Sequence, residues 1–180
     1  MTEQQYSPRK LEELILYLAD RMERDEHRGI GRIKLAKLIF FADFEAFARF
    51  GESITGASYT VDEHGPAPDE ELTATRDLEA AGDFEWVNRF DKQQIPVAKR
   101  TAQLDVFRPS ELEIVDEFLD RFRLLTGTEV RDIAHQHPAW KARKLGDKVP
   151  YWSVYMSREL PNTKDIAWAE AVVRDLRRAS

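Results

Sequence analysis

A run of predominantly apolar residues from Arg32 to about Phe50 constrains the fold of this chain more than any other segment. Its large side chains cover most of the circumference of a helix, which is typical of a helix buried on several sides. These side chains are Ile33, Leu35, Leu38, Ile39, Phe40, Phe41, Phe44, Phe47 and Phe50. Other elements must pack around this segment. We therefore predict a mainly α fold with a small β element (α+β), built as a compact helical domain around one central buried helix.

The polar residues of this predicted helix fall on two opposite sides. At 100° per residue, Asp43 lies among apolar side chains, nearly opposite a narrow polar stripe. The stripe consists of Lys34, Lys37, Glu45 and Arg49. An ionised carboxylate among apolar groups is costly unless it is hydrogen-bonded or paired, so Asp43 must have a partner. We interpret it as a structural buried polar residue that ties the helix to the loop around His64, and a catalytic acid or base is the alternative.

Helix-start and helix-stop signals place other helices around the central one. The dipeptide Ser7-Pro8 predicts the start of a first helix, as an N-cap followed by proline at the first helical position. The inward stripe of that helix is Leu11, Leu14, Ile15, Leu18 and Met22. Another helix is expected from about Asp69 to Gly82, with Leu72 and Leu78 turned inward.

Capping residues predict three more helices towards the C-terminus. The pairs are Ser110 with Glu113, Thr126 with Glu129, and Asn162 with Asp165. The first helix is amphipathic, and the second is short and must end before Pro138. The third covers about residues 162–178 and carries Ile166, Val173 and Leu176.

Short extended segments and one hairpin make up the predicted β element. Residues 57–61 look extended and lead into the turn His64-Gly65-Pro66-Ala67-Pro68, which two prolines and a glycine constrain. The runs Phe84-Glu85-Trp86-Val87 and Ile95-Pro96-Val97-Ala98 predict a β-hairpin. The alternating aromatic residues of Tyr151-Trp152-Ser153-Val154-Tyr155 are interpreted as a strand packed on the helical core.

The composition limits the class of protein. The length of 180 residues fits one domain, which we expect to span residues 1–180. The absence of Cys excludes disulfides, thiolate metal sites and cysteine nucleophiles, and it fits a reducing compartment. Without a leader or a run of about 20 apolar residues, the chain is expected to be cytoplasmic, with no membrane association. The net charge of -6 argues against nucleic acid as a partner.

No catalytic or metal-binding motif stands out. One alternative is a small hydrolase-like enzyme in which His64 acts as a base beside Asp43, but no nucleophile is evident and a Gly-x-Ser-x-Gly motif is absent. His135 and His137 would lie about 200° apart on a helix, which prevents joint metal binding. The Gly29-Ile30-Gly31 motif lacks the preceding strand and following residues that nucleotide binding needs. We assign no catalytic residues, no metal site and no cofactor.

A basic and aromatic strip over residues 141–155 has three interpretations. Its cations are Lys141, Arg143, Lys144 and Lys148, and its aromatic residues are Tyr151, Trp152 and Tyr155. We favour a solvated face beside a strand; a nucleic-acid-binding surface and a partner-binding edge are the alternatives. Trp140, directly before the strip, is expected to pack as an aromatic anchor.

Several motifs in a fixed order resemble the Panacea domain, the family of SocA-type antitoxins. They are Lys37-Leu38-Ile39-Phe40-Phe41-Ala42-Asp43, Gly51, Ile54-Thr55-Gly56, Tyr59, His64-Gly65-Pro66-Ala67-Pro68, Leu124-Leu125-Thr126 and Ile133-Ala134-His135-Gln136-His137-Pro138-Ala139-Trp140. The similarity spans about residues 10–155. It departs from the usual Gly-Pro-Val by having Ala67.

The resemblance implies a small bacterial or prophage protein of a type II toxin–antitoxin system. Members often neutralise a toxin encoded beside them by direct binding, and one type delivers its toxin to a protease. We therefore expect a protein-binding role, not an enzyme, with contacts from the Tyr59–Pro68 loop and the aromatic strip. The expected partner-binding residues are Tyr59, His64, Pro66, Trp140, Tyr151 and Tyr155. The identity of the toxin and the formation of a homodimer stay open.

Overall fold

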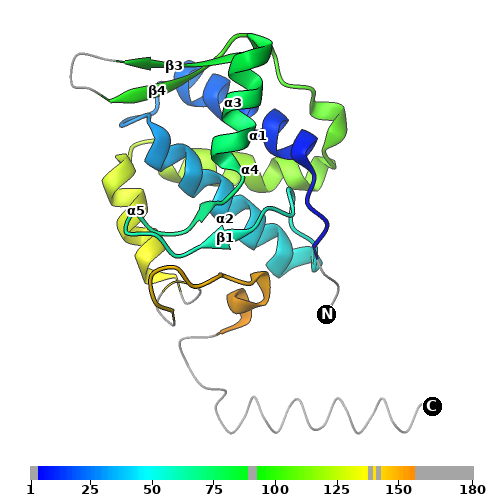
Figure 1. The fold of residues 1–180 in the computed structure, drawn as a ribbon, viewed down its shortest axis with the longest axis vertical. Coiled ribbons are helices and arrows are strands. Elements are labelled where there is room, and N and C mark those ends of the chain that lie inside the picture. Colours follow the sequence, from blue (N-terminus) through cyan, green and yellow to red (C-terminus); the bar gives the residue numbers. More distant parts are fainter. Residues whose placement is uncertain (1–3, 89–92, 138–139, 141–142, 157–180) are drawn as a thin grey trace, which may run out of the picture.

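The computed structural model of the chain describes residues 4–88, 93–137, 140 and 143–156. These residues form a mainly α structure with two small pairs of antiparallel strands, as predicted (Figure 1). The helices are α1 (Pro8–Arg24), α2 (Arg32–Phe50), α3 (Glu71–Ala81), α4 (Pro109–Phe122) and α5 (Gly127–Gln136), with the 3₁₀ helices η1 (Leu104–Val106) and η2 (Tyr151–Tyr155). The strands are β1 (Tyr59–Thr60), β2 (Ala67–Pro68), β3 (Phe84–Asn88) and β4 (Gln94–Ala98).

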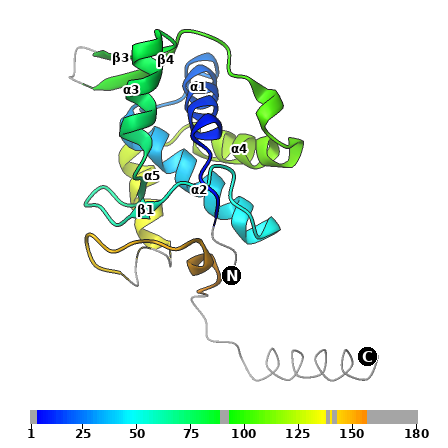
Figure 2. The ribbon, with the colours of Figure 1, turned by 45° about the vertical axis from the view of Figure 1, so that its right-hand side comes forward.

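Helix α2 is the centre of the fold, and its predicted bounds are confirmed. Helices α1, α4 and α5 and the 3₁₀ helix η2 all pack against it (Figures 1 and 2). Most of its side chains up to Ala46 are buried, and each fully buried Leu, Ile or Phe stabilises the fold by about 1.5–3 kcal/mol. Gly51 ends the helix in the left-handed conformation, at φ 75°, and donates its N–H to the carbonyl of Phe47.

Helix α1 begins and packs as predicted. The Ser7 hydroxyl accepts the N–H of Lys10 at 3.3 Å, and Pro8 is the first helical residue. All five residues of the predicted inward stripe are fully buried. The buried carboxylate of Glu13 binds the guanidinium of Arg100 through two hydrogen bonds of 2.9 Å, which fixes α1 to the segment after the hairpin.

Strand β1 carries a neighbour on each side. Tyr59 pairs with Pro68 of β2, and Thr60 forms an antiparallel bridge with Lys148. The N–H of Val149 donates to the carbonyl of Tyr59 at 2.8 Å, so the chain near residue 149 lies along the second edge of β1. The predicted hairpin is confirmed as β3 and β4, and Figure 1 shows it at the opposite end of the molecule from η2.

Two expected details of the helices were wrong. Leu72 is 45% exposed, because the buried face of α3 follows Glu71, Ala74, Thr75 and Leu78 and Leu72 points about 100° away from it. Helix α4 begins at Pro109, so the predicted cap lies too late in the sequence. The Glu111 carboxylate accepts the N–H of Arg108 at 2.8 Å and closes the first turn instead.

Residues 151–155 form the 3₁₀ helix η2, so the predicted strand was wrong. Pro150 has no N–H and cannot extend the ladder that Val149 makes with β1. The N–H of Ser153 instead donates to the carbonyl of Pro150 at 3.0 Å and starts a 3₁₀ turn. The predicted final helix, residues 162–178, lies outside the described residues. Within the described residues, the helices are all too short or too polar to cross a membrane.

Candidate functional site

Asp43 is the centre of a buried hydrogen-bond network. Its side chain is fully buried and accepts the N–H of Thr55 at 2.8 Å, the hydroxyl of Thr55 and the hydroxyl of Tyr59 at 2.7 Å. The hydroxyl of Tyr151 lies 3.2 Å from the same carboxylate and 2.8 Å from the carbonyl oxygen of Ala57. Burial raises the pKa of Asp43, and these hydrogen bonds oppose that rise. The network joins α2, the segment before β1, β1 itself and η2.

The side chain of His64 is not part of this network, so the link from Asp43 does not run through His64. Its side chain is exposed. The backbone N–H of His64 donates to the Asp62 carboxylate at 3.0 Å, in the turn after β1. The partners of Asp43 are hydroxyl and amide groups from Thr55, Tyr59 and Tyr151. Asp43 and His64 therefore do not form the hydrogen-bonded acid–base pair that the enzyme alternative requires.

A groove of about 510 Å³ opens directly above the Asp43 network. Its wall is formed by Gln4, Phe47, the segment Gly56–Tyr59 and the segment Lys148–Trp152. Tyr59 is 1% exposed and forms the floor, with the ring of Tyr151 centred 5.8 Å from it and edge-on. Phe47 stacks on Tyr151 at 5.5 Å between ring centres. The two tyrosines thus bind Asp43 through their hydroxyl groups and shape the groove with their rings.

The six expected partner-binding residues differ in exposure. Tyr59 and Pro66 are buried, so the expectation that they contact a partner directly does not fit their burial; they support the surface from beneath. Trp140 and Tyr151 are half-buried, and the ring of Trp140 stacks on His135 at 4.1 Å. The other two, His64 and Tyr155, are exposed. The expected contact surface included both Tyr59 and Tyr151, and both residues line the groove.

Exposed apolar side chains extend the groove surface along η2. Trp152 lines the groove and is 41% exposed, Tyr155 is 60% exposed and Met156 is 37% exposed. The hydroxyl of Tyr155 donates to the carbonyl of Phe47 at 3.2 Å, which fixes its ring beside α2. Trp152 belongs to the aromatic strip that was expected to bind a partner, although it was not one of the six residues named for that role.

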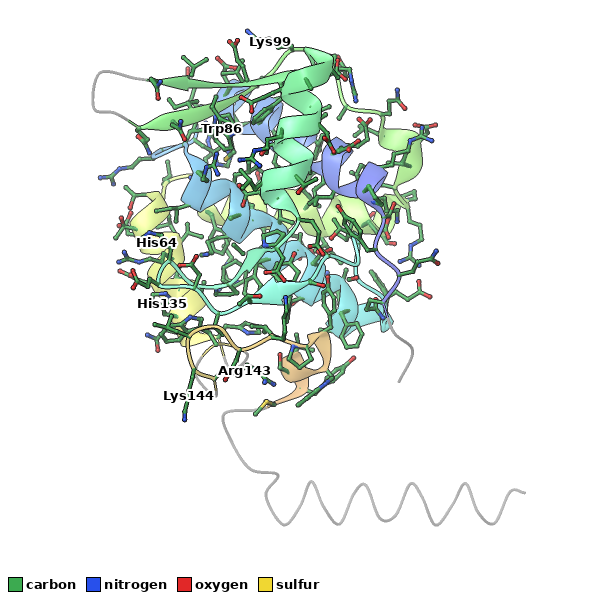
Figure 3. All side chains as sticks on the ribbon, in the orientation of Figure 1. His64, Trp86, Lys99, His135, Arg143 and Lys144 are labelled. Atoms are coloured by element: carbon green, nitrogen blue, oxygen red, sulfur yellow. The ribbon has the colours of Figure 1, made fainter. Side chains whose placement is uncertain are left out.

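Charged residues contact Lys148 and Trp152, two of the residues that line the groove. The guanidinium of Arg143 lies 5.6 Å from the centre of the Trp152 ring, and Lys144 follows it in the chain (Figure 3). Lys148 forms an ion pair with Asp69. The Asp147 carboxylate accepts the backbone N–H of Lys144 at 2.9 Å. The Arg143 guanidinium therefore makes a cation–π contact with an aromatic residue of the groove wall.

The His64-Gly65-Pro66 turn rests on a buried lysine. Lys37 is 1% exposed and donates to the carbonyl of Pro66 at 2.8 Å, and burial lowers its pKa to about 8. A side chain at Gly65 would press on Lys37 and on His135 of α5, and Gly65 has φ 83°. The turn is therefore held against α2 and α5 by close backbone packing.

The polar stripe of α2 is buried at its two lysines, Lys34 and Lys37, and reaches solvent only towards Arg49. Lys34 is fully buried and donates to the carbonyls of Arg28 at 2.7 Å and Leu125 at 2.8 Å. Burial lowers its pKa to about 8 as well. Close to Lys37, burial raises the pKa of Glu71 to about 7, and one carboxylate oxygen of Glu71 has no hydrogen-bond partner. No sequence signal marked the burial of the two lysines, because their acceptors are backbone carbonyls.

Comparison with known proteins gives one match. The model of a family described as antitoxin SocA-like, Panacea domain matches residues 35–141, which is more than half of the chain. The matched region begins inside α2 and covers the Asp43 network up to Tyr59, the His64 turn and α5. It ends before Arg143 and η2. No curated protein and no solved structure matches the chain.

Proposed function

Because this chain belongs to the antitoxin SocA-like Panacea domain family, we propose that it is an antitoxin that neutralises a cognate toxin protein by direct binding. On this proposal the protein acts in the bacterial cytoplasm, where the toxin acts, and needs no cofactor. It holds its partner and does not turn over a substrate.

The aromatic groove beside η2 is the observation that carries the proposal. The groove has a volume of about 510 Å³, and Phe47, Tyr151 and Trp152 line it. Exposed aromatic side chains such as Trp152 and Tyr155 are of the residue types that contribute most to protein–protein binding energy. The Asp43 network fixes the groove floor, so a partner would meet a preorganised surface and little ordering entropy would be lost.

The exposed turn at His64 is the second part of the proposed contact surface. Its backbone is fixed from beneath by Lys37 through the Pro66 carbonyl, while the His64 side chain points to solvent. Figure 3 shows His64 and His135 on the same side of the molecule, next to the end of α5. Rigid loops that display a polar side chain on a fixed scaffold are typical binding elements.

The proposal is tested by co-expression with the product of the adjacent gene. We expect that product to stop growth when expressed alone, and we expect this chain to restore growth and to co-purify with it. The substitution Ser58→Trp places a large side chain into the groove from an exposed position and should abolish both effects. The matched control is Leu124→Ala, at a 73% exposed apolar residue of the turn before α5, which should change neither.

The same experiment separates neutralisation by binding from delivery to a protease. Under direct neutralisation, the amount of toxin stays constant after translation is stopped, whether or not this chain is present. Under delivery to a protease, the toxin disappears faster when this chain is present. Lack of toxicity of the adjacent gene product together with lack of a complex would refute the antitoxin proposal.

A further inference from the structure

We infer that the C-terminal segment of this chain, about residues 162–178, docks as a helix into an apolar hollow between α2, α4, α5 and η2. The hollow has a volume of about 400 Å³. It shares no lining residue with the groove proposed for the toxin. This inference therefore goes beyond the proposed function and does not depend on it.

Helix faces form most of the wall of this hollow. Helices α4 and α5 and the 3₁₀ helix η2 all pack against α2 (Figures 1 and 2). On α2 the lining residues follow the i, i+3, i+4, i+7 spacing of one helix face, and they are Phe41, Phe44, Glu45 and Ala48. On α4 and α5 the lining residues have the i, i+3 spacing, and they are Phe118 with Arg121 and Ile133 with Gln136. Rows of this spacing are the ridges against which another helix packs, so the wall favours a helix as the occupant.

The floor of the hollow is apolar and its rim reaches solvent. The rings of Phe41 and Phe118 stack at 5.4 Å between centres and are almost buried. Ile133 and Val154 are half-buried, and the small side chain of Ala48 is exposed. An apolar helix face laid over these residues would remove their remaining apolar surface from water, which favours docking.

The charges at the rim do not call for a charged occupant. The hollow is lined by one acidic residue, Glu45, and one arginine, Arg121. The Glu45 carboxylate is paired with Arg49 at 2.7 Å, and the Arg121 guanidinium lies 5.7 Å from the centre of the Phe122 ring. Apolar contact is therefore the main interaction that this hollow offers.

The segment that follows η2 has the sequence of an amphipathic helix. Between residues 166 and 178, its large apolar side chains fall within an arc of about 160° at 100° per residue. They are Ile166, Trp168, Val172, Val173 and Leu176, and Ala169 lies among them. The charged residues of this stretch fall on the remaining arc, and they are Glu170, Arg174, Asp175, Arg177 and Arg178. A helix of this length gains most of its stability by packing its apolar face, so another surface must cover that face.

A short connection places this segment beside the hollow. Val154 lines the hollow, and Met156, two positions later, is the C-cap of η2. Residues 157–161 join Met156 to the expected N-cap at Asn162, and an extended chain of this length spans about 20 Å. The helix must therefore begin close to η2. A short linker also gives the segment a millimolar effective concentration at the hollow, so a free partner would have to compete with it.

Hydrogen–deuterium exchange of the full chain tests whether the segment is docked. We expect the amides of residues 166–176 to exchange at least about tenfold more slowly than in a synthetic peptide of residues 157–180. The substitution Ala169→Asp puts a charge on the apolar face and should restore the rate of the peptide. The matched control is Ala171→Asp, about 160° away around the helix, which should keep the protection. Wild-type exchange at the rate of the peptide, or equal rates in the two variants, would overturn the inference.

The reactivity of one cysteine at the rim locates the docked segment. The chain has no Cys, so Ala48→Cys introduces a single thiol at an exposed position of the hollow. Its alkylation by N-ethylmaleimide should become at least about tenfold faster when Ala169→Asp is added, and change less than about twofold when Ala171→Asp is added. The control thiol is Ala80→Cys, at an exposed alanine of α3 outside the hollow, whose rate Ala169→Asp should leave unchanged. An Ala48→Cys rate that does not respond to Ala169→Asp would place the segment elsewhere and overturn the inference.

Two other occupants of the hollow are outcomes of the same measurements. Protection of residues 166–176 that depends on protein concentration, together with a dimer detected by light scattering, would mean that two copies exchange the segment. An Ala48→Cys thiol that reacts at the same rate with and without Ala169→Asp, but slows when the toxin is bound, would assign the hollow to the toxin. Either result would overturn docking within one chain and leave the antitoxin proposal standing.

Discussion

The hydroxyl group of Tyr59 donates a hydrogen bond of 2.7 Å to the carboxylate of Asp43, and both side chains are completely buried. A carboxylate inside an apolar core normally calls for a cation, yet Asp43 is satisfied by amide and hydroxyl donors. These hydrogen bonds offset the cost of burying the carboxylate, and they link the central helix to the two segments that form the groove. It also explains why the groove floor is made of tyrosines and not of phenylalanines.

Replacing Asp43 by Asn should destabilise the protein strongly. The amide presents one acceptor oxygen where the carboxylate presents two, and its NH2 group faces groups of Thr55, Tyr59 and Tyr151 that now donate to Asp43, so buried donors lose their acceptor. We expect the free energy of unfolding to fall by about 3 kcal/mol, and by about 1 kcal/mol in Tyr59→Phe, which removes one donor. Urea denaturation of both variants measures this. An Asp43→Asn variant as stable as Tyr59→Phe would contradict the network.

Glu71 should make stability depend on pH. Burial raises its pKa from 4.5 to about 7, so between these pH values the unfolded chain has released the proton while the folded chain still holds it. Stability from this group is therefore complete below about pH 4.5 and is lost as the pH rises to about 7, by about 3 kcal/mol. The Glu71→Gln variant has no ionisable group at this position, so its stability should lack this pH dependence. The test is the difference in unfolding free energy between wild type and variant from pH 4 to pH 8; parallel curves would show that Glu71 does not titrate this way.

Gly56 should tolerate no side chain. It has φ 70°, and a Cβ there would overlap the backbone carbonyl of Gln5. Gly51 has a similar φ of 75° but open space around it, so Gly51→Ala carries only the conformational cost. We expect a loss of about 1 kcal/mol for Gly51→Ala and of about 3 kcal/mol or more for Gly56→Ala, measured by thermal or urea unfolding. Equal losses would mean that the N-terminal segment is not packed on Gly56.

Trp152→Ala should weaken toxin binding without weakening the fold. The side chain is 41% exposed and lines the groove, so its removal takes away partner contact but little core packing. An aromatic residue at the centre of an interface contributes about 2 kcal/mol or more, so the dissociation constant should rise about thirtyfold. Leu124→Ala, at an exposed leucine outside the groove, is the control with unchanged affinity. Calorimetry with the purified toxin measures both, and equal affinities would exclude the groove as the contact surface.

The fold could be predicted from the sequence wherever local pattern and burial agree. The apolar circumference of α2, the stripe of α1 and the Thr126–Glu129 cap are local signals, and the structure confirms them. The pattern failed at residues 151–155, where alternating aromatics fit a strand as well as a 3₁₀ helix and the missing N–H of Pro150 decides between them. Position in a helix wheel also cannot show that a lysine is buried.

The candidate site could be predicted only in part. Tyr59 and Tyr151 were expected on one surface, but the groove between them depends on segments that are about 90 residues apart in the chain. The burial of Lys34 and Lys37 was missed because their hydrogen-bond acceptors are main-chain carbonyls, which any residue type carries. The carbonyl of Leu125 lies 91 positions from Lys34, and that of Pro66 lies 29 positions from Lys37. Only tertiary packing brings such acceptors to a lysine.

The bond between Tyr151 and the Asp43 network has a consequence for the order of events during protein synthesis. Tyr151 follows Asp43 by 108 positions, whereas Thr55 and Tyr59 follow it by 12 and 16. The ribosome therefore releases the carboxylate and its first donors long before the residue that closes the groove. A nascent chain can assemble its helices around α2 while its binding surface is still missing one wall. Binding competence would thus arise last, and a partner could engage this protein only after translation has passed η2.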